Sequence, residues 1–210
     1  MDLKIKICGM AFPENIAEIS GVMPDYMGFI FHAQSPRNAL SLSAEALKCL
    51  PESVTPVGVF VNRPLDYILD RCDEYGICTV QLHGNESPAL CASLKSEGYA
   101  VWKAIGVDEN IRWEDLNSYK NVVDMFVFDT KSPIHGGTGC KYDWDILRSY
   151  PLDIPFLLSG GISPGDEGLI KIFDHPMFSG IDLNSRFEVA PGMKDVTLLK
   201  IFIKELRNHE

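Results

Sequence analysis

Short apolar runs alternate with amphipathic stretches along the whole chain. The apolar runs, rich in Val, Ile, Phe and Leu, predict eight buried strands at residues 4–9, 26–31, 55–61, 77–82, 99–105, 122–129, 155–159 and 178–182. The stretches between them predict eight helices at residues 13–20, 43–50, 64–75, 87–94, 109–118, 143–149, 164–173 and 196–206. Apolar strands that alternate with helices are typical of a parallel sheet with right-handed crossovers.

Eight strand–helix units in 210 residues predict a closed (β/α)8 barrel of the TIM type, within the α/β class. Since no linker or compositional break interrupts the series, we expect one domain over residues 1–210. A doubly wound open sheet is the alternative. Such a sheet normally carries a GxGxxG turn after its first strand, and Cys8-Gly9-Met10 departs from that pattern.

Composition narrows the classes of partner. The net charge of −10, without a long basic run, argues against nucleic acid or an anionic membrane as the main partner. No apolar run reaches membrane-spanning length and the chain does not open on a signal-peptide pattern, so we expect a cytoplasmic protein. The six cysteines form no CxxC pair, which argues against a zinc site or a disulfide framework.

Reactive side chains stand at the ends of the first and sixth strands. Lys6 and Cys8 share one strand face, and we expect that face to point into the barrel. An ammonium beside a thiol favours the thiolate, which is the reactive form of cysteine. Asp129 follows the apolar residues 125–128, where desolvation favours a protonated carboxyl suited to general acid catalysis. A packed thiol and a capping or salt-bridged aspartate are the alternatives.

The last two strand ends have the features of a phosphate site. Gly160 and Gly161 would let backbone amides approach an anion, and a helix that begins near Ser163 would add its positive end. A tight turn without a ligand is the alternative. The next strand ends in a turn that contains Asp182, Asn184 and Ser185.

Four further features bear on the site. Arg37 could bind a carboxylate in bidentate fashion, or it could lie solvated in its loop. Because the eighth and first strands are neighbours in a closed barrel, we expect an ion pair between Lys6 and Asp182. His83 would line or support the site, and the glycine-rich residues 136–139 could fold over a ligand.

In this order along the chain, these motifs resemble the phosphoribosylanthranilate isomerases of tryptophan biosynthesis. The matching motifs are Lys6-Ile7-Cys8-Gly9, Ser35-Pro36-Arg37, Gln81-Leu82-His83-Gly84, Phe128-Asp129, Gly136-Gly137-Thr138-Gly139 with Asp143-Trp144, Gly160-Gly161, Gly180-Ile181-Asp182-Leu183-Asn184-Ser185 and Pro191-Gly192-Met193-Lys194-Asp195. The resemblance implies a (β/α)8 barrel that needs no cofactor or metal, acts on a small phosphosugar, and is a monomer or a homodimer.

The resemblance also implies a reaction and a role for each site residue. The reaction is the Amadori rearrangement of N-(5-phosphoribosyl)anthranilate to 1-(2-carboxyphenylamino)-1-deoxyribulose 5-phosphate, the third step of tryptophan synthesis from chorismate. Asp129 would be the general acid, Cys8 the general base, and Arg37 the carboxylate ligand. The phosphate would lie against Gly160, Gly161 and the turn after Asp182. Arg186 stands where many members of the family have glycine.

Three other functions remain as alternatives. The histidine-pathway isomerase performs the same rearrangement on a similar barrel, but it has an acidic residue where this chain has Cys8. Another sugar-phosphate lyase or epimerase is a broader possibility. A barrel retained only as a phosphate-ligand sensor or as a subunit of a larger complex would be expected to lack the acid or the base, and this chain has both Cys8 and Asp129.

Overall fold

Eight parallel strands close into a barrel in the computed structural model, which describes residues 3–131 and 141–208. Each strand pairs with the next along the chain, and the last pairs with the first. The strands are β1 (Lys4–Cys8), β2 (Tyr26–Ile30), β3 (Thr55–Phe60), β4 (Thr79–Leu82), β5 (Ala100–Val107), β6 (Met125–Thr130), β7 (Phe156–Leu158) and β8 (Phe178–Leu183). The closed barrel confirms the fold class that the sequence predicts. Residues 136–139 and Cys140 lie outside the described residues.

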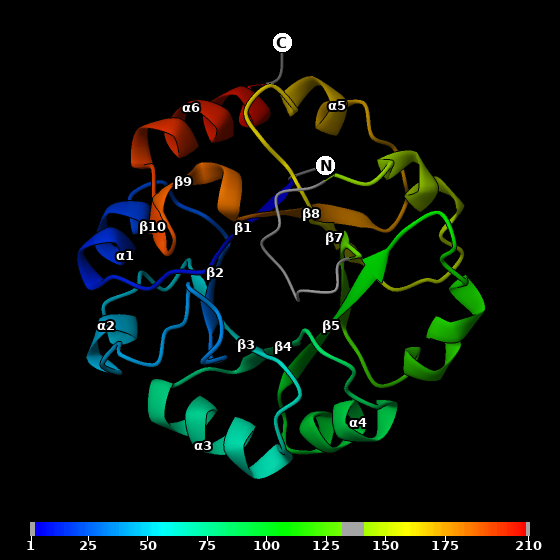
Figure 1. The fold of residues 1–210 in the computed structure, drawn as a ribbon, viewed down its shortest axis with the longest axis horizontal. Helices are drawn as coiled ribbons and strands as arrows, with labels where there is room; N and C mark the ends of the chain where they lie inside the picture. The colour runs from blue at the N-terminus through cyan, green and yellow to red at the C-terminus, as the bar shows by residue number, and fades with distance from the viewer. Residues whose placement is uncertain (1–2, 132–140, 209–210) are drawn as a thin grey trace.

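Helices cover the outside of this ring, as Figure 1 shows in a view down the barrel. The α-helices are α1 (Pro13–Ser20), α2 (Glu45–Lys48), α3 (Leu65–Tyr75), α4 (Pro88–Ser96), α5 (Glu167–Lys171) and α6 (Val196–Arg207). Three 3₁₀ helices complete the described helices: η1 (Trp113–Tyr119), η2 (Trp144–Ser149) and η3 (Ser185–Phe187). Within the part of the chain that is described, no helix is both long and apolar enough to cross a bilayer.

Alternation along the strands separates two packed regions. Ile5 and Ile7 are fully buried in the large apolar core that also contains the inner faces of the helices. A smaller cluster fills the barrel interior and consists of Val57, Trp102, Ala104, Val127 and Leu157. Registered neighbours in a parallel sheet face the same side, so Lys6, which pairs with Tyr26 and Asp182, belongs to the interior face.

Several helix predictions need correction. The helix expected at residues 43–50 is reduced to α2, and Ser43 does not cap it, because Ala44 occupies that position without a side-chain hydrogen bond. Two segments expected to be helical, 109–118 and 143–149, form the shorter 3₁₀ helices η1 and η2. Short helices with few residues of high propensity gain little from backbone hydrogen bonding alone, so their ends depend on tertiary packing.

The helix expected from Ser163 begins later, as α5 at Glu167. Gly165 lies between the two positions with a φ of 96°, a left-handed conformation that cannot continue a right-handed helix. An antiparallel hairpin that the sequence pattern does not predict follows β8. Its strands, β9 (Glu188–Ala190) and β10 (Met193–Lys194), are too short to produce a periodic pattern.

We predict that Gly180→Ala destabilises the seam where the barrel closes. A β-carbon at Gly180 would collide with the backbone carbonyl of Lys4 on β1, and backbone cannot rotate away. The free energy of unfolding, measured by urea denaturation, should fall by about 3 kcal/mol, the upper part of the range for overpacked sites. Gly168→Ala is the matched control in the exposed part of α5, with open space around its β-carbon. It should raise stability by about 0.8 kcal/mol through helix propensity. Equal effects at the two positions would contradict the packing argument.

Candidate active site

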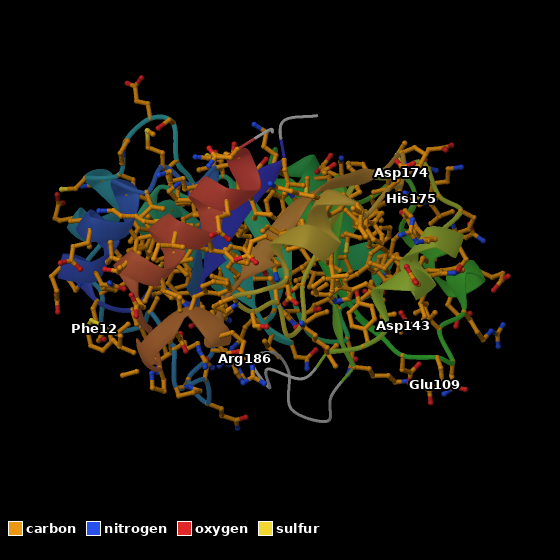
Figure 2. The ribbon with its side chains drawn as sticks, turned by 90° about the horizontal axis from the view of Figure 1, so that it is seen from above. Phe12, Glu109, Asp143, Asp174, His175 and Arg186 are labelled. Atoms are coloured by element: carbon orange, nitrogen blue, oxygen red, sulfur yellow. The ribbon has the colours of Figure 1, made fainter. Side chains whose placement is uncertain are left out.

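The candidate residues gather at one end of the barrel. Figure 2 views the molecule from the side and shows Glu109, Asp143 and Arg186, which follow strands, along one edge. Asp174 and His175, which precede β8, lie toward the opposite edge. The loops that follow strands therefore share one end, where the active sites of such barrels lie.

A buried ion pair joins the first and last strands at this end. The ammonium nitrogen of Lys6 lies 2.9 Å from each carboxylate oxygen of Asp182, and both side chains are almost fully buried. Burial lowers the pKa of Lys6, but the Asp182 carboxylate and the Cys8 sulfur outweigh this effect and raise it. The sequence prediction of this pair is confirmed. Both carboxylate oxygens of Asp182 are therefore engaged by Lys6.

Cys8 lies at the end of β1, with 5% of its surface exposed. Burial raises the pKa of its thiol, while the ammonium groups of Lys6 and Lys194 act in the opposite direction. Lys6 therefore favours the thiolate as the sequence suggests, but burial is the larger effect and the resting residue is a thiol. Gly28 gives the sulfur room, because a β-carbon there would lie 2.7 Å from the Sγ atom.

Asp129 is the penultimate residue of β6 and forms a short polar chain with His83 and with Gln81 of β4. Its Oδ2 atom lies 3.3 Å from Nε2 of His83, and its Oδ1 atom accepts a hydrogen bond from the amide of Thr130. Nδ1 of His83 lies 3.0 Å from Nε2 of Gln81. With the Gln81 amide assigned in this orientation, Nδ1 accepts and Nε2 carries the proton that faces Asp129. The structure thus places His83 in direct contact with the candidate acid.

The glycine pair Gly160 and Gly161 lies beside Asp129. Both residues have positive φ values, 88° and 68°, which form the sharp turn after β7. A β-carbon on Gly160 would lie 3.1 Å from Oδ1 of Asp129, so the turn and the carboxyl group are in close proximity. Backbone amides of this turn could therefore donate hydrogen bonds to an anion next to the candidate acid.

The expected helix contribution to an anion site is wrong. Asp166 caps the turn before α5, and its carboxylate accepts hydrogen bonds from the amide and hydroxyl groups of Ser163 at 2.7 and 3.0 Å. Lys141 also bonds this carboxylate. The donors at Ser163 therefore have a partner in the protein, and the helix itself starts farther along the chain.

Arg37 belongs to a buried network that the sequence analysis missed. Its Nε atom lies 2.9 Å from both carboxylate oxygens of Glu188, and Nη2 lies 2.8 Å from one of them. The ammonium group of Lys194 donates to Glu188 and to Oδ1 of Asn184, each at 2.7 Å. Asn184 is thus engaged by a cation, and Ser185 is a half-buried residue that starts η3. The only sequence signal for this network is a lysine next to a Pro-Gly turn.

Among the described residues, no group of three or more His, Cys, Asp or Glu side chains has the arrangement of a metal site. The described site instead contains one thiol, one carboxyl group that faces a histidine, and two further carboxylates that are paired with two ammonium groups and a guanidinium. This set can exchange protons at two separate atoms and can hold anions at two separate positions.

Comparisons with known proteins agree with this geometry. The family model described as N-(5'-phosphoribosyl)anthranilate (PRA) isomerase matches residues 5–205. The N-(5'-phosphoribosyl)anthranilate isomerase of Parabacteroides distasonis is 42% identical over 204 residues, which cover 96% of this chain and 92% of the relative.

Two solved structures give the same result. The phosphoribosyl anthranilate isomerase of Thermotoga maritima superposes with a TM-score of 0.83 at 32% identity, with 98% of each chain covered. A phosphoribosyl anthranilate isomerase in complex with reduced 1-(o-carboxyphenylamino)-1-deoxyribulose 5-phosphate superposes with a TM-score of 0.80 at 30% identity, again with 98% of each chain covered. Since the family model and the relatives span nearly its whole length, this chain belongs to the N-(5'-phosphoribosyl)anthranilate isomerase family.

Proposed function

We propose that this chain catalyses the Amadori rearrangement of N-(5-phosphoribosyl)anthranilate to 1-(2-carboxyphenylamino)-1-deoxyribulose 5-phosphate. The observation that carries the proposal is the pair Cys8 and Asp129, the last residue of β1 and the penultimate residue of β6, at the same end of a barrel of this family. An aldose–ketose isomerisation needs one group that gives a proton to an oxygen and one that takes a proton from carbon. The thiol and the carboxyl group supply these two functions.

The steps balance in protons. Asp129 in its acid form protonates the furanose ring oxygen, and the C1–oxygen bond breaks to give a protonated Schiff base. Cys8 gives its thiol proton to solvent, and the thiolate then removes the proton from C2, which leaves the enolamine and restores the thiol. The enolamine takes a proton at C1 and loses the proton of its C2 hydroxyl to give the ketone, and a proton from solvent restores the acid form of Asp129. Burial raises the pKa of Cys8, but the Schiff base is a cation, and a positive charge beside the sulfur favours the thiolate when it is needed.

Two anionic ends of the substrate have separate positions in this proposal. Arg37 binds the anthranilate carboxylate, and the turn at Gly160 and Gly161, together with the turn at Asn184 and Ser185, binds the phosphate. The positive φ values at the glycine pair and the contact between Gly160 and Asp129 support this arrangement, because they bring the phosphate turn close to the acid. The relative that holds a reduced carboxyphenylamino-deoxyribulose phosphate contains a ligand with the same two anions.

His83 supports Asp129 in this scheme, and Lys6 supports Cys8. Nε2 of His83 lies 3.3 Å from the Asp129 carboxylate, so it can return a proton after each turnover. We further propose that residues 1–210 act as one catalytic domain, as a monomer or a homodimer.

We predict that both catalytic residues are required for turnover. Anthranilate, phosphoribosyl pyrophosphate and the transferase generate the unstable substrate in the cuvette, and its fluorescence is followed after this protein is added. Cys8→Ala and Asp129→Asn should each lower kcat by about 10³-fold, within the range for general acid–base groups. Cys78→Ala, at an exposed thiol, should retain full activity. If the folded wild-type protein leaves the fluorescence decay unchanged, the proposed function is rejected.

We predict that Lys6→Met shifts the alkylation of Cys8 to higher pH. Lys6 opposes the effect of burial on the pKa of the thiol, so its loss should raise that pKa further. The rate of iodoacetamide labelling at Cys8, resolved by peptide mass spectrometry across pH, measures the shift.

Lys4→Met is the matched control for this variant. Lys4 lies on the same strand face as Lys6 but pairs with Asp25 near the other end of β1. Because Lys6→Met leaves Asp182 without its partner, the double variant Lys6→Met/Asp182→Leu is measured beside it. An unchanged labelling profile in both Lys6 variants would exclude a role of Lys6 in tuning the thiol.

A further inference from the structure

The hairpin of β9 and β10 carries a charged pair to which the proposed reaction assigns no role. Glu188 on β9 and Lys194 on β10 are registered partners across this hairpin. In Figure 1 the hairpin lies beside β1, between α1 and α6. The side chain of Asn15 on α1 bonds the backbone amide and carbonyl of Lys194, which fixes the hairpin against α1. Glu188 and Lys194 are therefore positioned both by the pairing of their two strands and by the hydrogen bonds from α1.

Glu188 is surrounded by donors. Its carboxylate accepts hydrogen bonds from Arg37, from Lys194 and from the amide of Gly192. Only 5% of the Glu188 side chain and none of the Lys194 side chain is exposed. Burial raises the pKa of Glu188, but these hydrogen bonds and the Lys194 ammonium outweigh it and hold the pKa below its usual value. Glu188 is thus a carboxylate that binds two cations.

The contact between Arg37 and Glu188 leaves one edge of the Arg37 guanidinium free to donate hydrogen bonds. Glu188 bonds the edge formed by Nε and Nη2, and Nη1 has no hydrogen-bond partner among residues 3–131 and 141–208. A guanidinium is a planar fork with five donors, so one edge can be fixed by the protein while another meets a ligand. The Arg37 side chain remains 12% exposed, which leaves it accessible from the mouth of the barrel.

Charge explains why a lysine accompanies the glutamate. Arg37 and Glu188 alone would form a neutral pair, and the glutamate would repel an incoming carboxylate. Burial lowers the pKa of Lys194, and the Glu188 carboxylate, 2.7 Å away, acts in the opposite direction. With Lys194 as an ammonium, its charge cancels that of the glutamate, and the trio has one positive charge in excess. Lys194 also bonds Asn184, and this bond connects the trio to the turn after β8.

Building on the proposed function, we infer that Glu188 and Lys194 are positioning residues that set the preference for a carboxylated substrate. Glu188 orients the guanidinium of Arg37 toward the aromatic carboxylate. Lys194 neutralises Glu188, so that Arg37 meets the ligand with its full charge. Neither residue contacts the reacting atoms.

The test compares two ligands that differ by one carboxylate. One is reduced 1-(o-carboxyphenylamino)-1-deoxyribulose 5-phosphate, and the other is the same compound with a plain phenylamino group. Kd values are measured by isothermal titration calorimetry for the wild-type protein, Glu188→Gln, Lys194→Met and the double variant. Glu45→Gln, at an exposed acid on α2, is the control, and circular dichroism confirms that each variant is folded.

We predict that Glu188→Gln weakens binding of the carboxylated ligand about tenfold or more, the usual size of a charged hydrogen bond, and leaves the other ligand within threefold. Lys194→Met should also lose carboxylate selectivity, because the Glu188 charge is then unbalanced. The double variant removes both charges and should lose less than the two single variants combined, since coupled residues are not additive. The control should match the wild-type protein.

Other outcomes overturn the inference in distinguishable ways. If the wild-type protein prefers the carboxylated ligand but Glu188→Gln keeps that preference, or weakens both ligands equally, Glu188 is a structural residue and the proposed function stands. A double variant whose loss equals the sum of the single losses contradicts the charge compensation by Lys194. A wild-type protein without any preference between the ligands overturns this inference and the proposed role of Arg37 together.

Discussion

Two opposite charges are buried in the seam where β8 returns to β1. Removing an ammonium or a carboxylate from water costs several kcal/mol, so neither Lys6 nor Asp182 could occupy this interior without the other. Lys6 is registered directly opposite Asp182, so this ion pair can form only when β8 pairs with β1 and closes the barrel. Cys8 stands two residues beyond Lys6 on the same strand face, so the same register that joins the two charges also places the thiol at the mouth of the barrel.

At this position, burial and the neighbouring positive charges have opposite effects on the pKa of the Cys8 thiol. A thiol at the end of an interior strand face is desolvated, which raises its pKa and protects it from side reactions in the resting protein. Lys6 and Lys194 oppose that effect from two directions without overcoming it. In the proposed reaction the thiolate forms when a further positive charge is present, and the ring-opened substrate would supply that charge. Burial keeps Cys8 a thiol in the resting protein, whereas the proposed activation to the thiolate belongs to the complex with the ring-opened substrate.

The sequence predicts the parts of this structure that depend on the alternation of side chains along a strand and on the order of the strands in the barrel. Strand alternation and the closure of the barrel were sufficient to place Lys6 opposite Asp182, because both inferences need only parity and strand order. Local backbone geometry is harder to predict from the sequence. Gly165 adopts a left-handed conformation, so α5 begins only at Glu167. The helix end expected at Ser163 is therefore absent from the expected anion site. The pairing of Arg37 with Glu188 spans 151 residues between two irregular segments, where no periodic pattern indicates which side chains meet.

The charges of the site form one neutral group and one group with an excess of cations, and the second would attract the anionic ends of the proposed substrate to an acidic protein. Lys6 and Asp182 form the neutral pair, whereas the trio of Arg37, Glu188 and Lys194 contains two cationic side chains for one carboxylate. Gly9, directly after Cys8, lets the second group approach, since a β-carbon there would lie 2.9 Å from both Arg37 and Asn184. The overall charge of −10 is spread over the whole chain and is screened by salt within about 8–10 Å. A ligand at the mouth therefore responds to the nearby cations, and the net charge of the protein does not decide what binds there.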